Sequence, residues 1–263
     1  MMNRFWLLFV STCALPVCGI VVACSSTTTA AATPDGGSTS GDIPVDGGGS
    51  TDGSTTEAST GATTCTSARD QLLVPIDKVS SGTVSVVSDT GGVKTLYVDA
   101  SAGGVPNAIK NPRIYVDLGA ATRVDLTDKT APMSTAWDLA LKRDKIFTNS
   151  GDAGAGQGGA ASIAMTFSAV DAASANAEPL FTEKFFDADC NPQLDQTSTV
   201  ATTFSDWYDY DQVTHIPSPK DVTYVVRGGT GKKYKVAIKS YMGEADGGTG
   251  AATGYYILQV SAL

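Results

Sequence analysis

Apolar and polar side chains alternate with a period of two through most of the chain after residue 65, and this pattern constrains the fold more than any other feature. The alternation is clearest in 137–142, which reads Trp-Asp-Leu-Ala-Leu-Lys, and in 233–239, which reads Lys-Tyr-Lys-Val-Ala-Ile-Lys. Successive side chains of a β-strand point to opposite faces, so these runs predict half-buried strands. Similar short runs, separated by Gly, Asn, Asp and Pro, lie at Leu72 to Ile76, Thr83 to Val87, Thr95 to Val98, Ile114 to Leu118, Ser162 to Phe167, Thr223 to Arg227 and Tyr255 to Val260.

Helical periodicity is almost absent from the same region. No stretch carries an apolar stripe over three helical turns, and only Pro179 to Asp187 is predicted to form a short helix. Residues 65–263 are long enough for one hydrophobic core and short of the length at which two domains are expected. We therefore predict an all-β fold class, with a single, mostly antiparallel domain over 65–263.

The N-terminus has the organisation of a secretory signal. Met1 to Arg4 carries one positive charge, and Phe5 to Val22 is almost entirely apolar or small. Such a segment is long enough to cross a bilayer, which needs roughly 20 apolar residues, so a retained membrane helix is the alternative. The end of the segment, Val21-Val22-Ala23-Cys24, resembles the lipobox of bacterial lipoproteins. The pattern predicts a signal peptide over 1–23, with Cys24 as the lipidated residue that holds the protein to a lipid bilayer.

The residue after Cys24 bears on localisation. This residue is Ser25. In this respect the chain resembles lipoproteins of Gram-negative bacteria that reach the outer membrane, since an Asp at this position is typical of retention in the inner membrane. The segment that follows, up to Thr64, consists largely of Ser, Thr, Gly, Ala, Pro and Asp, and its only sizeable apolar side chains are Ile43 and Val45. Such a composition cannot offset the entropy of ordering, so we expect residues 24–64 to form a disordered tether.

The charge balance argues against nucleic acid as a partner. The chain has a net charge of −9 and a pI near 4.5, whereas nucleic-acid binding needs a concentrated basic surface. Lys233, Lys235 and Lys239 do lie close together, but they fall on one face of an alternating segment. We interpret them as a solvated strand face.

Cysteine usage agrees with export. Two of the five cysteines lie in the signal and one is Cys24, which leaves Cys65 and Cys190. In an exported protein this even remainder predicts a disulfide between them. A two-cysteine metal site is the poorer interpretation, because no second Cys or His lies near either residue at ligand spacing.

A glycine-rich segment, Gly151 to Gly159, contains a literal match to the GxGxxG dinucleotide fingerprint. That fingerprint requires a helix directly after the loop, whereas here Ser162 to Phe167 alternates like a strand. We interpret the segment as a flexible connection between strands. No Ser-His-Asp arrangement or HExxH motif is present either, so the sequence predicts no enzyme.

Two blocks of sequence resemble the HmuY-type haem-binding lipoproteins. The first comprises 137–143, 146–151 and 156–160, and includes Trp-Asp-Leu-Ala-Leu-Lys-Arg and Ile-Phe-Thr-Asn-Ser-Gly. The second comprises Trp207-Tyr208-Asp209-Tyr210, Thr214-His215, Pro219-Lys220, 224–227, 231–232, 234–235, Ile238, Ser240-Tyr241 and Gly254-Tyr255-Tyr256. Together they cover roughly residues 112–263, and the match is weaker over 65–111.

The resemblance implies an all-β, membrane-anchored protein that binds haem and passes it to an outer-membrane receptor, without catalytic activity. Members differ in the axial ligands of the haem iron, which are His in the prototype and Met in some relatives. This chain has one histidine, so two histidines of one monomer cannot hold the iron. The alternative function is a surface interaction or adhesion module on the same β scaffold with no haem bound.

His215 lies close to the expected position of the prototype's second axial histidine, and an ordinary loop histidine before Pro217 is the alternative. Met133 and Met242 are the candidate thioether ligands, and no metal other than haem iron is expected. Tyr208 and Tyr210 are alternative phenolate ligands, and with Trp207 they are candidate aromatic residues of the pocket. Trp137 and Trp207 are expected in the core or a pocket wall. We expect Asp138 to pair with Lys142 or Arg143, or to accept hydrogen bonds.

Overall fold

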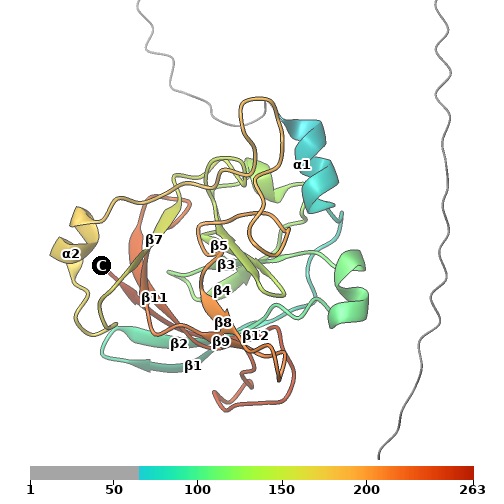
Figure 1. Ribbon diagram of the computed structural model, residues 1–263. Coiled ribbons are helices and arrows are strands. Elements are labelled where there is room, and N and C mark those ends of the chain that lie inside the picture. Colours follow the sequence, from blue (N-terminus) through green and yellow to red (C-terminus); the bar gives the residue numbers. More distant parts are fainter. Residues whose placement is uncertain (1–64) are drawn as a thin grey trace, which may run out of the picture. The chain divides into compact units, whose positions relative to one another are not determined.

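Residues 65–263 are described by the computed structural model, and β-strands dominate them (Figure 1). The predicted signal peptide, Cys24 and the tether lie outside the described residues. Within 65–263 the strands pair in antiparallel fashion, which confirms the predicted fold class. No helix within these residues is long and apolar enough to span a membrane.

The larger sheet has six strands. Their order across the sheet is β1 (Val84–Thr90), β2 (Val93–Asp99), β12 (Tyr255–Ala262), β11 (Lys233–Ser240), β10 (Thr223–Arg227) and β7 (Gly159–Ile163). The last strand of the chain, β12, thus pairs with β2 on one side and with β11 on the other. Strands from early and late in the described residues therefore share one sheet.

A second sheet has four strands, in the order β4 (Thr122–Val124), β3 (Ile114–Asp117), β5 (Leu139–Lys142) and β6 (Lys145–Thr148). A small hairpin pairs β8 (Tyr208–Tyr210) with β9 (Pro217–Pro219). The two α-helices, α1 (Thr66–Leu73) and α2 (Ala172–Ala177), lie at opposite sides of the view in Figure 1. Short 3-10 turns occupy Val105–Lys110 and Ala131–Met133.

Both faces of the four-stranded sheet are buried, which explains its apolar content. Leu139 and Leu141 of β5 belong to the main core, together with residues of the six-stranded sheet such as Leu96. Ala140 belongs instead to a second cluster that contains Phe147. This division follows directly from the period of two along a strand. Each large apolar side chain buried in this way contributes about 1.5–3 kcal/mol.

Three segments depart from the predicted secondary structure. Of the run Ser162 to Phe167, predicted as a strand, only Ser162 and Ile163 belong to β7, and 164–167 form bends and a turn. Leu72 and Leu73, predicted to begin a strand, instead end α1, because a short apolar run fits either structure and here packs on the second cluster. Residues 179–187, predicted to be a short helix, are extended. Phe181 exchanges backbone hydrogen bonds with Ala160 of β7, and this sheet pairing replaces helical hydrogen bonds.

The glycine-rich loop joins β6 to β7, but it is closely packed rather than flexible. Asn149 is fully buried, donates from Nδ2 to the carbonyls of Ser134 and Trp137, and accepts from the Gly156 N–H. A Cβ on Gly156 would lie 2.6 Å from Asn149 Cγ, so glycine is required by the close approach. The glycine spacing that matches the dinucleotide fingerprint therefore allows the loop to pack closely around Asn149.

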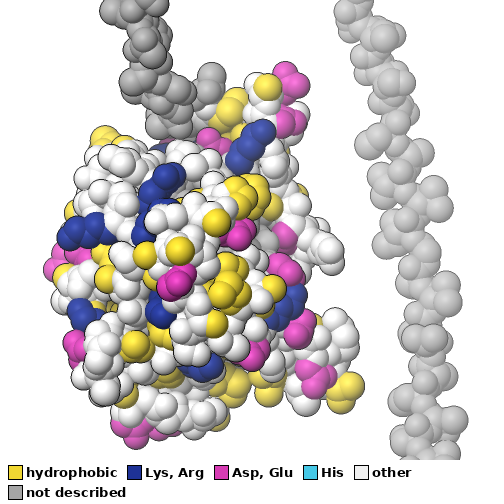
Figure 2. Space-filling view, turned by 90° about the vertical axis from the view of Figure 1, so that its left-hand side faces the viewer, with side chains coloured by type: hydrophobic (Ala, Val, Ile, Leu, Met, Phe, Trp, Pro, Cys, Tyr) yellow, Lys and Arg dark blue, Asp and Glu magenta, His cyan; other side chains and the backbone are white. Residues whose placement is uncertain are grey.

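The lysines of β11 are not a uniformly solvated face, which corrects that prediction. Lys235 Nζ donates to the Val170 carbonyl at 2.8 Å and lies 4.8 Å from the centre of the Phe167 ring. Lys233 Nζ donates to Asn176 Oδ1 at 2.8 Å. Lys239 is exposed as expected. On the face of the molecule shown in Figure 2, basic and acidic side chains are intermingled and form no continuous basic patch.

A disulfide joins Cys65 to Cys190, with 5.4 Å between their Cα atoms. It connects the residue preceding α1 to a loop 125 residues further along the chain.

Asp138 accepts hydrogen bonds from the Leu118 and Gly229 N–H groups. Of the two roles expected for it, an ion pair or a hydrogen-bond acceptor, the structure shows the second.

Candidate functional site

A cavity with a volume of about 750 Å³ is lined by Tyr208 and Tyr210, two of the predicted ligands. Its lining comes entirely from the segment between Leu194 and Gln212, which precedes and includes β8, and contains Ala201, Tyr208 and Tyr210. The volume falls within the range of roughly 300–1,000 Å³ that is typical of small-molecule sites. Before β8, turns and hydrogen bonds to the Asp195 carboxylate shape this segment.

The β8–β9 hairpin places the two tyrosines. Tyr208 pairs with Pro219 and Tyr210 with Pro217, so the tyrosines lie two residues apart on one strand and face the same side. The Tyr208 ring packs edge-on against Trp207, with 4.7 Å between ring centres. Burial and the neighbouring Asp144 carboxylate raise the pKa of Tyr208 above its ordinary value.

Trp207 packs against Tyr208 on the core side of the cavity wall. Its side chain is fully buried in the main core, and its indole Nε1 donates to the Asp144 carbonyl at 2.8 Å. Trp207 is therefore core packing beneath Tyr208, and the lining of the cavity does not include it. Trp137 is likewise buried in the second cluster.

His215 lies in the turn between β8 and β9. Its backbone φ is +58°, a left-handed conformation in which histidine is several-fold enriched among non-glycine residues. Its N–H donates to the Asp211 carbonyl, and the Asp211 side chain accepts from the Val213 and Thr214 N–H groups. The imidazole is exposed, and its Nδ1 lies 3.0 Å from the Tyr210 hydroxyl oxygen. Tyr210 therefore connects His215 to the cavity.

Each carboxylate of the lining has a lysine partner. Lys145 Nζ lies 2.8 Å from Asp195, and Lys220 Nζ donates to Asp206. Burial alone would raise the pKa of Asp195, but hydrogen bonds from Lys145, Thr197 and Thr199 lower it below the ordinary range. The cavity wall is therefore charge-balanced despite its two acidic residues.

The structure places the two candidate methionines elsewhere. Met133 ends a 3-10 turn with 75 % of its side chain exposed, and Met242 is half-buried just after β11. Neither lines the cavity. His215 is not itself among the lining residues, and its contact with Tyr210, which lines the cavity, brings it to the cavity's edge.

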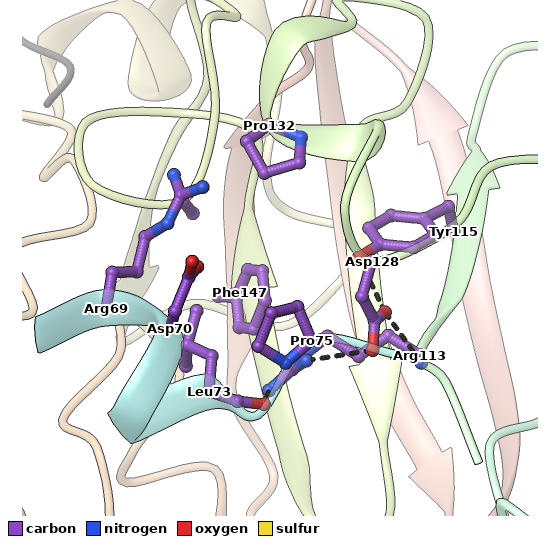
Figure 3. Close-up of a pocket in the computed structure, with 10 residues that line it drawn as sticks. Arg69, Asp70, Leu73, Pro75, Arg113, Tyr115, Asp128, Pro132 and Phe147 are labelled. Carbon is purple, nitrogen blue, oxygen red and sulfur yellow. Dashed lines mark hydrogen bonds and ion pairs between the residues drawn. The ribbon is translucent and has the colours of Figure 1, made fainter. Parts of the chain in front are cut away.

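A much smaller cavity of about 20 Å³ lies between α1 and the second sheet (Figure 3). Asp128 accepts there from Arg113 Nη1 at 3.3 Å and from the Tyr115 hydroxyl at 2.9 Å. Burial, followed by the Asp128 carboxylate, raises the pKa of Tyr115 well above its ordinary value. Because this network is satisfied and its space is close to that of one water, it is a structural buried ion pair.

Several residues of the larger cavity were not identified from the sequence. Leu194, Asp195, Ala201 and Gln212 belong to a polar, irregular segment in which no periodicity or motif marks a wall. Within residues 65–263, no group of three or more His, Cys, Asp or Glu side chains is arranged to hold a metal ion.

Comparison with known proteins identifies the family. The family model described as HmuY protein matches residues 110–256, and no curated protein matches the chain. Three similar solved structures each have a TM-score of 0.41. A candidate lipoprotein from Bacteroides fragilis is 16 % identical, with 67 % of this chain and 92 % of that chain covered. A candidate HmuY-like haem-binding protein from Bacteroides vulgatus is 17 % identical, with 65 % and 91 % covered. The apo HmuY analogue of Tannerella forsythia is 12 % identical, with 66 % and 98 % covered.

The family match extends over more than half of the chain and includes both β5–β6 and the β8–β9 hairpin. This protein belongs to the HmuY family.

Proposed function

We propose that this protein binds haem in the cavity beside the β8–β9 hairpin, with His215 as a ligand of the iron. The observation that carries the proposal is the 3.0 Å contact between His215 Nδ1 and the Tyr210 hydroxyl, at the edge of a cavity of about 750 Å³. Histidines that bind metal commonly use their other ring nitrogen in a hydrogen bond, which fixes the tautomer and the ring orientation. With Nδ1 held by Tyr210, Nε2 is the nitrogen available to the iron.

The donors and the shape of the site fit haem. Tyr208 and Tyr210 offer aromatic surface to a flat ring, and the pairing of Asp195 with Lys145 reduces repulsion of an anionic ligand. Bound haem would supply an iron centre that takes axial nitrogen, sulfur or oxygen ligands. Tyr208 and Tyr210 are the oxygen donors beside the cavity. Neither Met133 nor Met242 lines the cavity, so substitutions at these methionines serve as controls.

The role that follows is binding and transfer rather than catalysis. We propose that the chain is exported, that Cys24 carries the lipid anchor, and that the folded domain presents haem at the outer membrane for an uptake receptor. The signal pattern before Cys24 supports this location. Labelling cells with radioactive palmitate should mark the wild-type protein and leave a Cys24→Ala variant unlabelled. Equal labelling of both proteins would exclude Cys24 as the acceptor.

The test of the site is an absorbance titration of the purified protein with haemin. Binding should sharpen and shift the Soret band until the protein is saturated. Ala201→Trp, which places a large side chain in the cavity wall, should weaken binding by at least tenfold. Met133→Leu, at an exposed position away from the lining, is the matched control. Unchanged haemin binding by Ala201→Trp would place the ligand elsewhere, and no binding by the wild type would reject the function.

The alternative is a surface interaction module, which one observation favours. Val213, Tyr210 and Ile216 of the β8–β9 hairpin are 88 %, 46 % and 36 % exposed, and apolar side chains exposed together on one element can form an interaction surface. If Val213→Ser abolishes capture of an outer-membrane protein while the haemin titration is negative, the interaction module is the better account.

A further inference from the structure

A second cavity, of about 370 Å³, lies on the other side of the loop that walls the haem cavity. It is bordered by the end of α1, by the turn between β5 and β6, and by residues 198–200. Its apolar surface comes from Leu72, Leu73, Phe147 and Val200, which pack at the edge of the second cluster. No described residue lines both cavities, although the ion pair between Lys145 and Asp195 joins their walls.

Cations are concentrated along one side of the cavity. Lys142 of β5 pairs directly with Lys145 of β6, and Arg113 lies one position beyond the Ile114–Leu141 pair, next to Lys142 in the antiparallel register. The order Arg113, Lys142, Lys145 therefore forms a row of three positive charges across three neighbouring strands. Like charges directly opposite each other destabilise a sheet. In a chain of net charge −9, such a row is unexpected.

The turn itself adds one cation and one anion to the lining, and the guanidinium of its Arg143 donates to Thr253. The two residues that connect β5 to β6 are Arg143 and Asp144, and Arg143 adopts a φ of +53°. Two-residue hairpin turns of this kind favour Asn and Gly, because a larger side chain is strained there. The hairpin thus carries a basic residue where glycine would be more stable.

The three cations of the row differ in their partners. Arg113 is bound to Asp128 and to the Leu73 carbonyl, as Figure 3 shows. Lys145 is bound to Asp195 and Asp144. For Lys142, no hydrogen bond or ion pair joins its ammonium to any other described residue, although its side chain is half-buried. Burial and the nearby Arg113 lower the pKa of Lys142, and attraction by the Asp128 carboxylate only partly offsets them.

A half-buried ammonium without a partner is costly unless an anion approaches it. The cavity leaves room for an anion beside Lys142 and next to an apolar wall. A positive charge and an apolar surface are the two features that recognise an amphipathic anion. We propose that this cavity binds a small amphipathic anion, whose carboxylate or phosphate head group contacts Lys142 and whose apolar part lies against Leu72, Leu73 and Val200. The Lys142 ammonium acts as the specific donor, and Arg113 and Lys145 contribute positive potential.

The experiment is isothermal titration calorimetry of the purified protein with octanoate, octyl phosphate and neutral octan-1-ol. Octanoate or octyl phosphate should bind, and octanol should bind at least tenfold more weakly because it lacks the charge. Tighter binding of one anion identifies whether the head group is a carboxylate or a phosphate. Failure of both anions to bind, or equal binding of octanol, would overturn the proposal.

Variants locate the site. Lys142→Gln should weaken anion binding by roughly tenfold or more, as expected for loss of a charge-assisted hydrogen bond. Lys142→Arg should largely retain it, and Lys239→Gln, at an exposed position on β11, is the matched control. Leu72→Gln should weaken binding through the apolar wall, and circular dichroism should show that each variant is folded. If Lys142→Gln binds as tightly as Lys239→Gln, the site is not at Lys142.

The two cavities are tested separately by Ala201→Trp. This variant is predicted to lose haemin and to keep octanoate, because Ala201 lines only the cavity beside the β8–β9 hairpin. Loss of octanoate with Ala201→Trp would contradict a second, independent site. The result for octanoate stands whether or not the protein binds haemin.

Discussion

Lys145 Nζ lies 2.8 Å from Asp195 Oδ2, and this ion pair joins the β5–β6 hairpin to the loop that separates the two cavities. Asp195 lines the cavity beside Tyr208, and Lys145 lines the cavity that contains Lys142. Both side chains are largely buried, and Asp195 also accepts from the Thr197 and Thr199 hydroxyls. One contact therefore shapes a wall of both sites.

Asp195→Asn should lower the free energy of unfolding by about 1–3 kcal/mol at pH 7, the range for hydrogen bonds that involve charged groups. It should also weaken haemin binding, because the wall loop loses its attachment to β6. Urea denaturation and haemin titration measure the two effects. Asp89→Asn, at an exposed position on β1, is the matched control and should leave both unchanged.

The same pair predicts a pH dependence. The pKa of Asp195 is lower in the folded protein than in the unfolded chain, so its contribution to stability is present above the ordinary Asp pKa of about 3.9. That contribution should decline as the pH falls below this value. Urea denaturation from pH 7 down to pH 3 should show the wild type losing its advantage over Asp195→Asn. A constant difference between them across this range would show that the carboxylate charge is not responsible.

Asn149→Asp should destabilise the protein by about 3 kcal/mol or more. The change replaces the Nδ2 donor, which is bonded to two carbonyls, by an acceptor and buries a negative charge. Asn176→Asp is the matched control, because Asn176 is exposed on α2 and already accepts from Lys233. The second change should be neutral or slightly stabilising in urea denaturation, and equal losses for both variants would contradict the packing role of Asn149.

Replacing both cysteines of the disulfide by serine should lower stability by about 2–5 kcal/mol, the usual loss for a native disulfide that closes a long loop. Thermal unfolding of the Cys65→Ser/Cys190→Ser variant measures the change. The wild type in reductant should unfold at a similar temperature to the variant. If the wild type without reductant does so as well, the disulfide does not contribute to stability.

How far the fold follows from the sequence depends on the segment. Thr223 to Arg227 was predicted as a strand and is β10 over the same residues, because its short apolar run ends at a glycine pair and β10 is buried on both faces. Residues 179–187 resist prediction, since their extended form depends on pairing with Ala160, which no local pattern reveals. Local preference yields to tertiary pairing in that segment.

The candidate site was only partly predictable, for a related physical reason. Tyr208 and Tyr210 share a strand, so their common face follows from the period of two. The wall formed by 194–201 depends on the ion pair between Lys145 and Asp195, which lie 50 residues apart. That Lys142 has no ion-pair partner among the described residues could not be predicted, because its neighbours come from three strands. The row formed by Arg113, Lys142 and Lys145 follows only from the register of those strands.

The central claim is that His215, held by Tyr210, binds haem iron. Its most direct test is the absorbance spectrum of the haemin complex of the purified protein, compared between the wild type, His215→Ala and Met133→Leu. The account predicts that the Soret band of the His215→Ala complex differs from that of the wild type, because the imidazole ligand is lost, and that Met133→Leu matches the wild type. A His215→Ala complex with the same Soret band and affinity as the wild type would contradict the claim.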